Sequence, residues 1–474
     1  MNGLENARVG GGAGGTNLHP FVMIVLLIAI LLTLLLPRKY AVVPFLLAIF
    51  LSPFGQELYV AGVHFYISRV LIIFGCVRIV WTKFSSRMEI VAGGFTVIDN
   101  LFLLRAIVRS LATFLEFVQM QAFVNQVGFL LDTLGGYLLL RFLIRDEEDV
   151  VRVIKTFAFI VSILGVVMVG EKIFDRNLFG YIGGTLIPTV RDGAIRAKGS
   201  LTGPIQSGTF GATLFCLFAW LWQSGRARFA GAAGAVGSAV MVVTSASSTP
   251  LLGALAGGLA IAFWPLRKNM RAVRWALAVL LVTLHLVMKA PVWFLINHVN
   301  LIAGNSGDHR AMIIDGFIRH FSEWWLIGVK STANWGWDMW DQANQFVTEG
   351  ESGGLATFIC FVFLISKSFA RLGNARKLVE GNRKEEWMFW LFGAALFSHV
   401  VSFFGISFSD QAETAWFALL AMICTVTIPT AVQKLADDRA LSRIPTRVPA
   451  TYSLGASFGP PNRVSRLGTF NNKR

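Results

Sequence analysis

Long apolar runs follow one another along almost the whole chain, from Pro20 to Ala431. An α-helix needs roughly 20 apolar residues to cross about 30 Å of hydrocarbon, and many of these runs approach that length. Hydrophobic residues make up 55% of the sequence and charged residues only 15%, so a water-soluble globule could not bury the apolar surface. Because lipid offers the backbone no hydrogen-bond partner, the spans are expected to be helices. The sequence therefore predicts an all-α, polytopic integral membrane protein with about 12 to 14 transmembrane helices.

The positions of these runs suggest a simple domain organisation. A flexible, Gly-rich N-terminus at residues 1–19 precedes a transmembrane helical domain at residues 20–430. The N-terminus lacks a basic region before the first run, so it does not resemble a cleavable signal. The second run is too short to cross a bilayer alone and fits a re-entrant segment, which leaves the side of the N-terminus open. The expected spans are 20–36, 41–53, 60–82, 97–117, 123–144, 151–171, 206–223, 229–247, 249–265, 273–290, 354–369, 387–406 and 413–430.

The net charge of +15 would suggest a nucleic-acid partner for a soluble protein, but its placement here indicates membrane topology. Basic residues cluster in short segments between apolar runs, and the positive-inside rule makes these segments cytoplasmic. Alternation then places residues 172–205 and 291–353 on the opposite side as two outer loops. The basic tail at residues 431–474 has no sustained periodicity, so we expect it to be disordered and cytoplasmic. No nucleic-acid partner is expected.

Several ionisable residues lie inside expected spans, where a charge is costly unless it has a partner or faces a wet cavity. Arg105 and Arg109 are one helical turn apart and share a face. They either line an anion-accepting cavity or form structural ion pairs. Together with Asp132 they would form the substrate path of a transporter or flippase. The four cysteines lie in apolar runs without CxxC pairing and are interpreted as core residues.

The first outer loop ends in a segment suited to phosphate, Gly193 to Gly208. Arg196 and Lys198 stand just outside a span, beside glycines that allow backbone N–H groups to approach a ligand. A guanidinium fork binds two phosphate oxygens at once, and reduced access of water strengthens the attraction. The alternative is an ordinary polar loop with scattered charges.

The second outer loop contains a predicted amphipathic helix along the membrane interface. Met312, Ile313, Phe317 and Phe321 repeat at helical spacing. Arg310 would lie at the start of this helix, near the membrane opening. His309 and His320 lack metal-ligand spacing on one helical face and no third ligand is evident, so no metal is expected.

The same loop continues with a segment rich in tryptophan, from Trp335 to Gly354. Trp335, Trp337 and Trp340 form either an interfacial aromatic belt or flat faces on which sugar rings stack. Asp341, Gln342 and Asn344 offer hydrogen-bond partners for sugar hydroxyls.

The order of these segments resembles the O-antigen ligase and polymerase superfamily of bacterial membrane proteins, and within it the exopolysaccharide polymerases. The resemblance covers roughly residues 190 to 415. It is carried by short motifs in a shared order: Arg196-Ala-Lys-Gly-Ser-Leu-Thr-Gly-Pro204, Ser245-Ala-Ser-Ser-Thr-Pro250, Arg310, Asp341-Gln-Ala-Asn-Gln-Phe346 before Gly353-Gly-Leu355, and Phe404-Gly-Ile-Ser-Phe-Ser-Asp-Gln411.

The resemblance implies a multi-helix membrane glycosyltransferase that needs neither metal nor cofactor and uses an undecaprenyl-diphosphate-linked oligosaccharide as donor. Family arginines bind the diphosphate, and their counterparts here are Arg196 and Arg310. In ligases, a histidine before an asparagine of the long loop is taken as the base. This chain has Ala343 before Asn344, and Gly203 before Pro204 where many relatives place a histidine. These departures put the identity of the base in doubt and weigh against a ligase.

A sugar hydroxyl that attacks an anomeric carbon needs a proton acceptor, while the leaving diphosphate needs its charge neutralised. Asp341 is the first candidate for the acceptor. Arginine binding and proximity alone could supply much of the acceleration. The other candidate acceptors are Glu349, Glu351, Asp410 and His309.

We therefore expect a polymerase of lipid-linked repeat units in the bacterial cytoplasmic (inner) membrane, with its active site toward the periplasm. The catalytic residues would be Arg196, Arg310 and Asp341. A ligase and a transporter or flippase remain the alternatives. The expected partners are the donor lipid, the bilayer and, beyond them, chain-length regulator and export proteins. The substrate-binding residues would be Lys198, Gln342, Asn344, Trp337 and Asp410.

Overall fold

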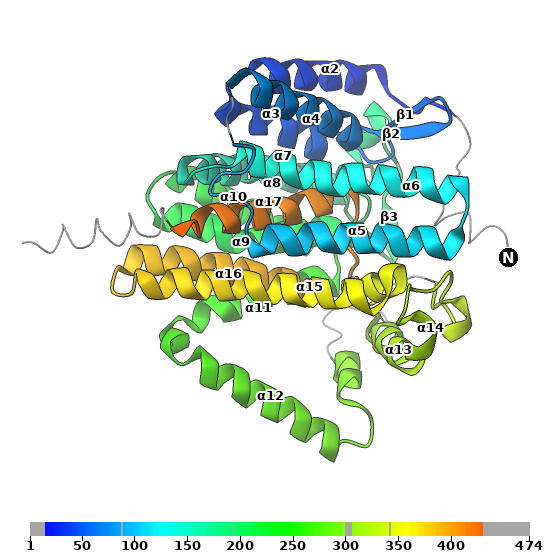
Figure 1. Ribbon diagram of the computed structural model, residues 1–474, viewed down its shortest axis with the longest axis vertical. Coiled ribbons are helices and arrows are strands. Elements are labelled where there is room, and N and C mark those ends of the chain that lie inside the picture. Colours follow the sequence, from blue (N-terminus) through cyan, green and yellow to red (C-terminus); the bar gives the residue numbers. More distant parts are fainter. Residues whose placement is uncertain (1–14, 87–88, 192, 299–305, 341–342, 430–474) are drawn as a thin grey trace, which may run out of the picture.

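A computed structural model describes residues 15–86, 89–191, 193–298, 306–340 and 343–429. These residues form a bundle of roughly parallel and antiparallel helices, with two small β-hairpins and two short helices gathered at one end (Figure 1). We call this end, which carries β1, β2, β3, β4, α13 and α14, the hairpin end. The mostly helical architecture agrees with the expected fold class.

The elements appear in the following order along the chain. The helices of the first half are α2 (Pro20–Leu35), α3 (Arg38–Leu51), α4 (Ile67–Ser86), α5 (Val97–Phe117), α6 (Met120–Leu130), the π-helical turn η1 (Leu131–Gly135), α7 (Gly136–Leu143) and α8 (Glu147–Phe174). Those of the second half are α9 (Pro204–Gln223), α10 (Arg228–Thr244), α11 (Ser248–Ala262), α12 (Met270–Val287), α13 (Ser306–Arg319), α14 (Phe321–Trp324), α15 (Gln345–Leu378), α16 (Arg383–Ser402) and α17 (Asp410–Val426).

Two antiparallel hairpins stand between helices at the hairpin end. The strands β1 (Glu57–Val60) and β2 (Val63–Tyr66) pair so that Val60 faces Val63, and β3 (Thr189–Arg191) pairs with β4 (Ala194–Arg196). Ala61 and Gly62 both have positive φ, as the tight two-residue turn between β1 and β2 requires. Residues 60–66 were expected at the start of a span; they form this hairpin instead.

Five helical segments in the described part of the chain are long and apolar enough to cross a membrane. This supports the prediction of a membrane protein with transmembrane helices. Three further apolar helices, α2, α10 and α11, are shorter. The five segments are Met120–Leu143, Glu147–Phe174, Pro204–Gln223, Met270–Val287 and Gln345–Leu378.

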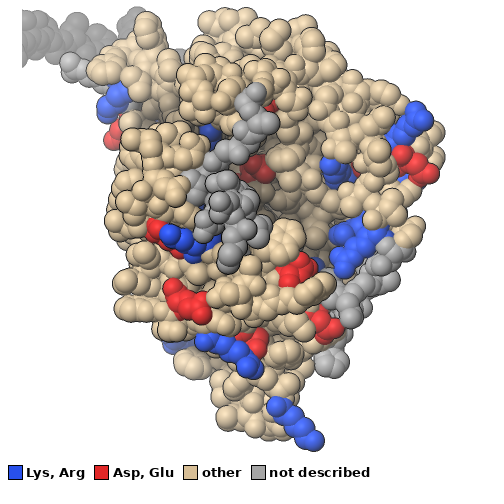
Figure 2. Space-filling view, turned by 90° about the vertical axis from the view of Figure 1, so that its right-hand side faces the viewer, with Lys and Arg blue, Asp and Glu red and all other residues tan. Residues whose placement is uncertain are grey.

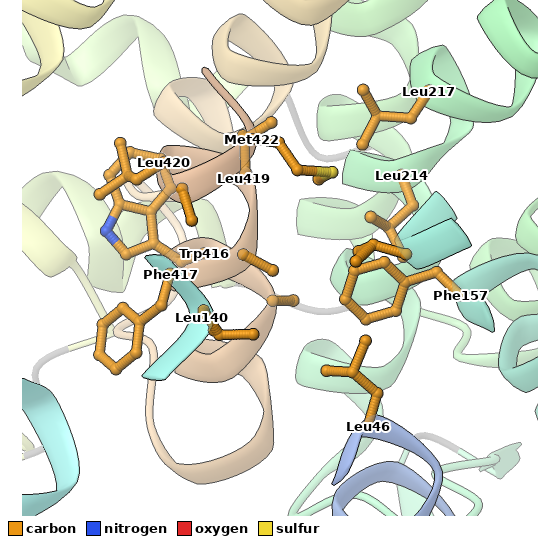
Figure 3. Packing of buried hydrophobic residues seen from close by; sticks show 14 of the residues in the cluster. Leu46, Leu140, Phe157, Leu214, Leu217, Trp416, Phe417, Leu419, Leu420 and Met422 are labelled. Carbon is orange, nitrogen blue, oxygen red and sulfur yellow. The ribbon is translucent and has the colours of Figure 1, made fainter. Parts of the chain in front are cut away.

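The last helix, α17, lies at the centre of the bundle. From Ala415 to Val426 all of its residues are buried. Figure 3 shows its side chains between Leu46 of α3, Leu140 of α7, Phe157 of α8, and Leu214 with Leu217 of α9. Apolar contact on all sides fits a helix that is hydrophobic around its whole circumference.

One helix stands apart from this core. None of the α12 residues is buried, and Figure 1 shows α12 leaning away from the rest of the bundle. Its leucine and valine side chains are mostly exposed, as lipid contact would allow.

The helix α15 begins at Gln345, earlier than the span expected at 354–369, and Gly354 interrupts it. Gly354 has φ 70°, and a Cβ there would come within 2.5 Å of the Leu326 carbonyl oxygen. The Leu355 N–H donates to the Trp325 carbonyl at 2.8 Å, so the chain after α14 packs against the break. The first turns of α15 therefore belong to the hairpin end, where they carry polar residues.

Candidate functional site

Arg196 and Arg310, which lie more than a hundred residues apart in sequence, are brought together at the hairpin end. Arg196 closes β4, and its Nη2 donates to Ser247 Oγ. Arg310, in the first turns of α13, donates from Nη2 to Thr249 Oγ1 at 2.8 Å. Ser247 and Thr249 are neighbours at the start of α11, so one short turn holds both guanidinium groups.

The electrostatic environment of Arg310 is strongly positive. Its side chain is only 7% exposed, and its Nε has no hydrogen-bond partner among the described residues. Burial, together with the positive charges of Arg191 and Arg196, lowers the pKa of Arg310 to about 10. Arg310 stays protonated at neutral pH, so three cations share a confined region. An anion bound there would offset their repulsion.

The turn that receives both arginines is packed tightly against its neighbours. Ala246 has a positive φ of 44°. A Cβ on Gly208 of α9 would lie 2.6 Å from Pro250 Cγ, so only glycine fits at this crossing. Thr249 Oγ1 also donates to the Gly405 carbonyl at 3.2 Å, which ties the turn to the loop before α17. Packing therefore fixes where the two guanidinium groups meet.

Lys198 lies two residues beyond Arg196, on a turn anchored to α8. The backbone N–H groups of Lys198 and Gly199 donate to Glu171 Oε2 at 3.1 and 2.9 Å. Burial lowers the pKa of the Lys198 amine. The structure thus keeps Lys198 in the same loop as Arg196, in a half-buried position.

Asp410 begins α17 and faces the same loop from the other side. Its Oδ2 accepts from Thr202 Oγ1 at 3.2 Å, and the neighbouring Ser409 accepts from Gln206 Nε2 at 2.7 Å. These bonds join the loop between α16 and α17 to the start of α9. Asp410 is exposed at this end of the molecule.

Figure 2 looks onto the hairpin end and shows acidic and basic side chains around a hollow near its centre. Deeper in the bundle lies a group that we call the inner cluster: Arg105 and Arg109 of α5, Glu349 of α15 and Glu413 of α17. Arg105 Nε donates to Glu349 Oε2 at 2.8 Å, and Gln345 Nε2 donates to Glu349 Oε1 at 2.7 Å. For Arg105 the structure therefore favours the ion-pair interpretation.

The remaining predicted site residues are Asp341, Gln342, Asn344 and Trp337. Asp341 and Gln342 lie outside the described residues. Asn344 is only 1% exposed, and its Oδ1 accepts from the Phe346 and Val347 N–H groups as the cap of α15. Trp337 is 90% exposed, as a residue at the membrane interface or in an open glycan path would be.

The other candidate proton acceptors occupy different environments. Glu349 is fully buried in its ion pair with Arg105, and Glu351 is buried further along α15. Glu413 was not among the candidates, because it stands at the start of an apolar run without a recognisable motif.

Among the described residues, no group of three or more His, Cys, Asp or Glu side chains could hold a metal ion.

The hydroxyl partners of the arginines were also not predicted as site residues from the sequence. Ser247 and Thr249 belong to the Ser245–Pro250 motif, but that motif carried no assigned role beyond the resemblance.

Comparison with protein-family models finds none that matches this chain, and no curated protein matches it.

Proposed function

We propose that this protein is a membrane glycosyltransferase that polymerises undecaprenyl-diphosphate-linked oligosaccharide repeat units into an extracellular polysaccharide. The observation that carries the proposal is the meeting of Arg196 and Arg310 on one turn at the start of α11. The sequence resemblance to the O-antigen ligase and polymerase superfamily supplies the substrate class. The proposed location is the bacterial inner membrane, with the hairpin end toward the periplasm.

The chemistry of the arginine pair suits a leaving diphosphate. Each guanidinium can donate two hydrogen bonds to phosphate oxygens, and the positive surroundings of Arg310 favour an anionic ligand. In the reaction, a hydroxyl oxygen of one repeat unit bonds to the anomeric carbon of the other. The bond from that carbon to the diphosphate oxygen breaks, and undecaprenyl diphosphate leaves with both electrons.

The proton of the attacking hydroxyl passes to a carboxylate or to water. Charge neutralisation by the arginines lowers the barrier because negative charge develops on the leaving oxygen. Holding donor and acceptor together supplies a further part of the acceleration. Both effects depend on the fixed geometry of the Ser247–Thr249 turn.

The test replaces Arg310 by Lys. Lysine keeps the charge but cannot reproduce the bidentate fork, so we expect polymer to fall by at least about tenfold while the protein still inserts in the membrane. Arg319→Lys is the matched control: Arg319 is on the same helix, exposed and paired with Asp315. Wild-type polymer from Arg310→Lys would remove Arg310 from the site.

Deletion of the gene separates this function from its alternatives. Single repeat units accumulating on lipid would indicate a polymerase. Unattached long chains would indicate a ligase instead, and repeat units trapped on the cytoplasmic side would indicate a flippase.

A further inference from the structure

The inner cluster contains two charged groups that have no hydrogen-bond or ion-pair partner among the described residues. Arg109 forms no hydrogen bond or ion pair there; its guanidinium lies 4.7 Å from the centre of the Phe129 ring. Glu413 likewise forms neither, although Arg109 and Arg105 lie within electrostatic range. Removing a charge from water without a hydrogen-bond partner is costly. The two groups are therefore expected to bind water or a ligand.

Glu413 is only partly buried, unlike the other residues of its helix after Asp410. From Gln411 to Val426, every residue of α17 is buried except Glu413, and α17 is the central helix of the bundle (Figure 1). Because α17 is enclosed by other helices, we expect this partial exposure to be toward the interior of the bundle and not toward lipid. It lies one turn inside α17 from Asp410, which is itself exposed at the hairpin end.

The charge of the inner cluster distinguishes it from the arginine pair. Two arginines, Arg105 and Arg109, stand against two glutamates, Glu349 and Glu413, so the formal charges cancel when all four groups are ionised. Such a cluster does not favour a phosphate. It offers a free acceptor on Glu413 and free donors on Arg109, which suits sugar hydroxyls, because each hydroxyl both donates and accepts.

The loop between α16 and α17 lies between the two sites. On one flank, the Gly405 carbonyl accepts from Thr249, the residue that also binds Arg310. On the other flank, the Phe408 N–H donates to Gln345 Oε1 at 2.7 Å, and Gln345 binds Glu349. A lipid-linked sugar whose diphosphate is held at the arginine pair would extend along this loop toward the inner cluster.

We infer that Glu413 and Arg109 form a subsite that binds the hydroxyl groups of an uncharged sugar in the repeat unit. The inference rests on the proposed function and adds to it the second half of the substrate site. Glu413 accepts hydrogen bonds from the sugar hydroxyls, and Arg109 donates to their oxygens. The subsite recognises the glycan, while the arginine pair recognises the diphosphate.

Two ligands separate these roles in a binding experiment on the purified full-length protein. One is undecaprenyl diphosphate without sugar, and the other is the lipid-linked repeat unit extracted from cells that lack this protein. We expect Glu413→Ala to weaken binding of the sugar-bearing lipid by about tenfold and to leave bare carrier binding unchanged. Glu413→Gln, which keeps the side-chain size, should give a smaller loss in the same direction. Glu380→Ala, an exposed glutamate paired with Lys268, is the control.

The outcomes distinguish the two proposals. If both Glu413 variants bind the sugar-bearing lipid as the wild type does, or lose both ligands together, the subsite is wrong. If Arg310→Lys keeps full affinity for the bare carrier, the proposed diphosphate site is wrong, whatever the Glu413 variants show. Loss of the bare carrier in Arg310→Lys, with loss of only the sugar-dependent affinity in Glu413→Ala, supports both.

Discussion

At the scale of single residues, the bundle contains charged side chains that are fully enclosed and paired. Arg141 of α7 is 0% exposed and donates from Nε to Asp99 Oδ1 at 2.8 Å. Tyr137 donates to the same oxygen at 2.6 Å, and Asp99 also completes the capping box of α5 with Thr96. One carboxylate thus serves a helix end, a phenol and a guanidinium. The sequence places Arg141 near the end of the expected span at residues 123–144, but it does not identify Asp99 as its partner.

Replacing Asp99 by Asn should therefore destabilise the protein strongly. The change leaves the Arg141 charge buried without a counter-charge, which typically costs about 3–5 kcal/mol. The effect is measured as the unfolding temperature of the purified protein when it is heated in detergent. Glu380→Gln, at an exposed pair, should leave the unfolding temperature unchanged. Equal stability of the two variants would show that the buried pair has no structural importance.

At the scale of helices, close crossings depend on glycine. Gly237 of α10 packs on α8, where an added Cβ would lie 2.9 Å from the Val161 carbonyl oxygen and 3.0 Å from its carbon. Gly258 of α11, in contrast, has nothing within 4 Å of an added Cβ. The two glycines look alike in sequence, since both lie in small-residue helices. Only the crossing geometry separates them.

This difference predicts opposite effects of one substitution. Gly237→Ala should lower stability, because backbone atoms of α8 cannot move aside without shifting the helix, and overpacking typically costs about 1–3 kcal/mol. Gly258→Ala should be neutral or slightly stabilising, since alanine is the better helix former by about 1 kcal/mol. Thermal unfolding of both variants provides the comparison, and a more stable Gly237→Ala protein would contradict the assigned crossing.

At the scale of the whole molecule, the two ends of the bundle differ in character. The hairpin end carries the arginine pair and Trp337, while the start of α16, just after its turn from α15, carries basic residues such as Lys384. The positive-inside rule assigns the latter to the cytoplasm. The proposed function requires the hairpin end to face outward, because the polysaccharide is built there.

Labelling of single cysteines tests this orientation. Trp337→Cys should react with a membrane-impermeant maleimide in intact spheroplasts, because Trp337 is almost fully exposed at the hairpin end. Lys384→Cys, also exposed, should react only after permeabilisation. The unsubstituted protein, with its own four cysteines, gives the background. The reverse pattern would place the arginine pair in the cytoplasm and refute the proposed function.

Local properties of the sequence were enough to predict the broad class of the molecule, a helical membrane protein. Run length and composition predicted membrane helices, and helical spacing around Ile313 and Phe317 corresponds to α13. The strand pairing at residues 57–66 was missed because its apolar residues continue directly into α4. The early start of α15 was missed because its first turns are polar and resemble a loop.

By itself, the sequence determined that this chain needs lipid around it and that its polar chemistry is concentrated between the spans, because hydropathy and loop composition are local quantities. Tertiary structure alone decided which charges meet: Arg196 with Arg310 on the Ser247–Thr249 turn, and Arg105 with Glu349. It also decided that Glu413 stays accessible on a helix that is otherwise buried from Gln411 onward. These pairings depend on how distant helices cross, and neither hydropathy nor spacing along the chain encodes a crossing.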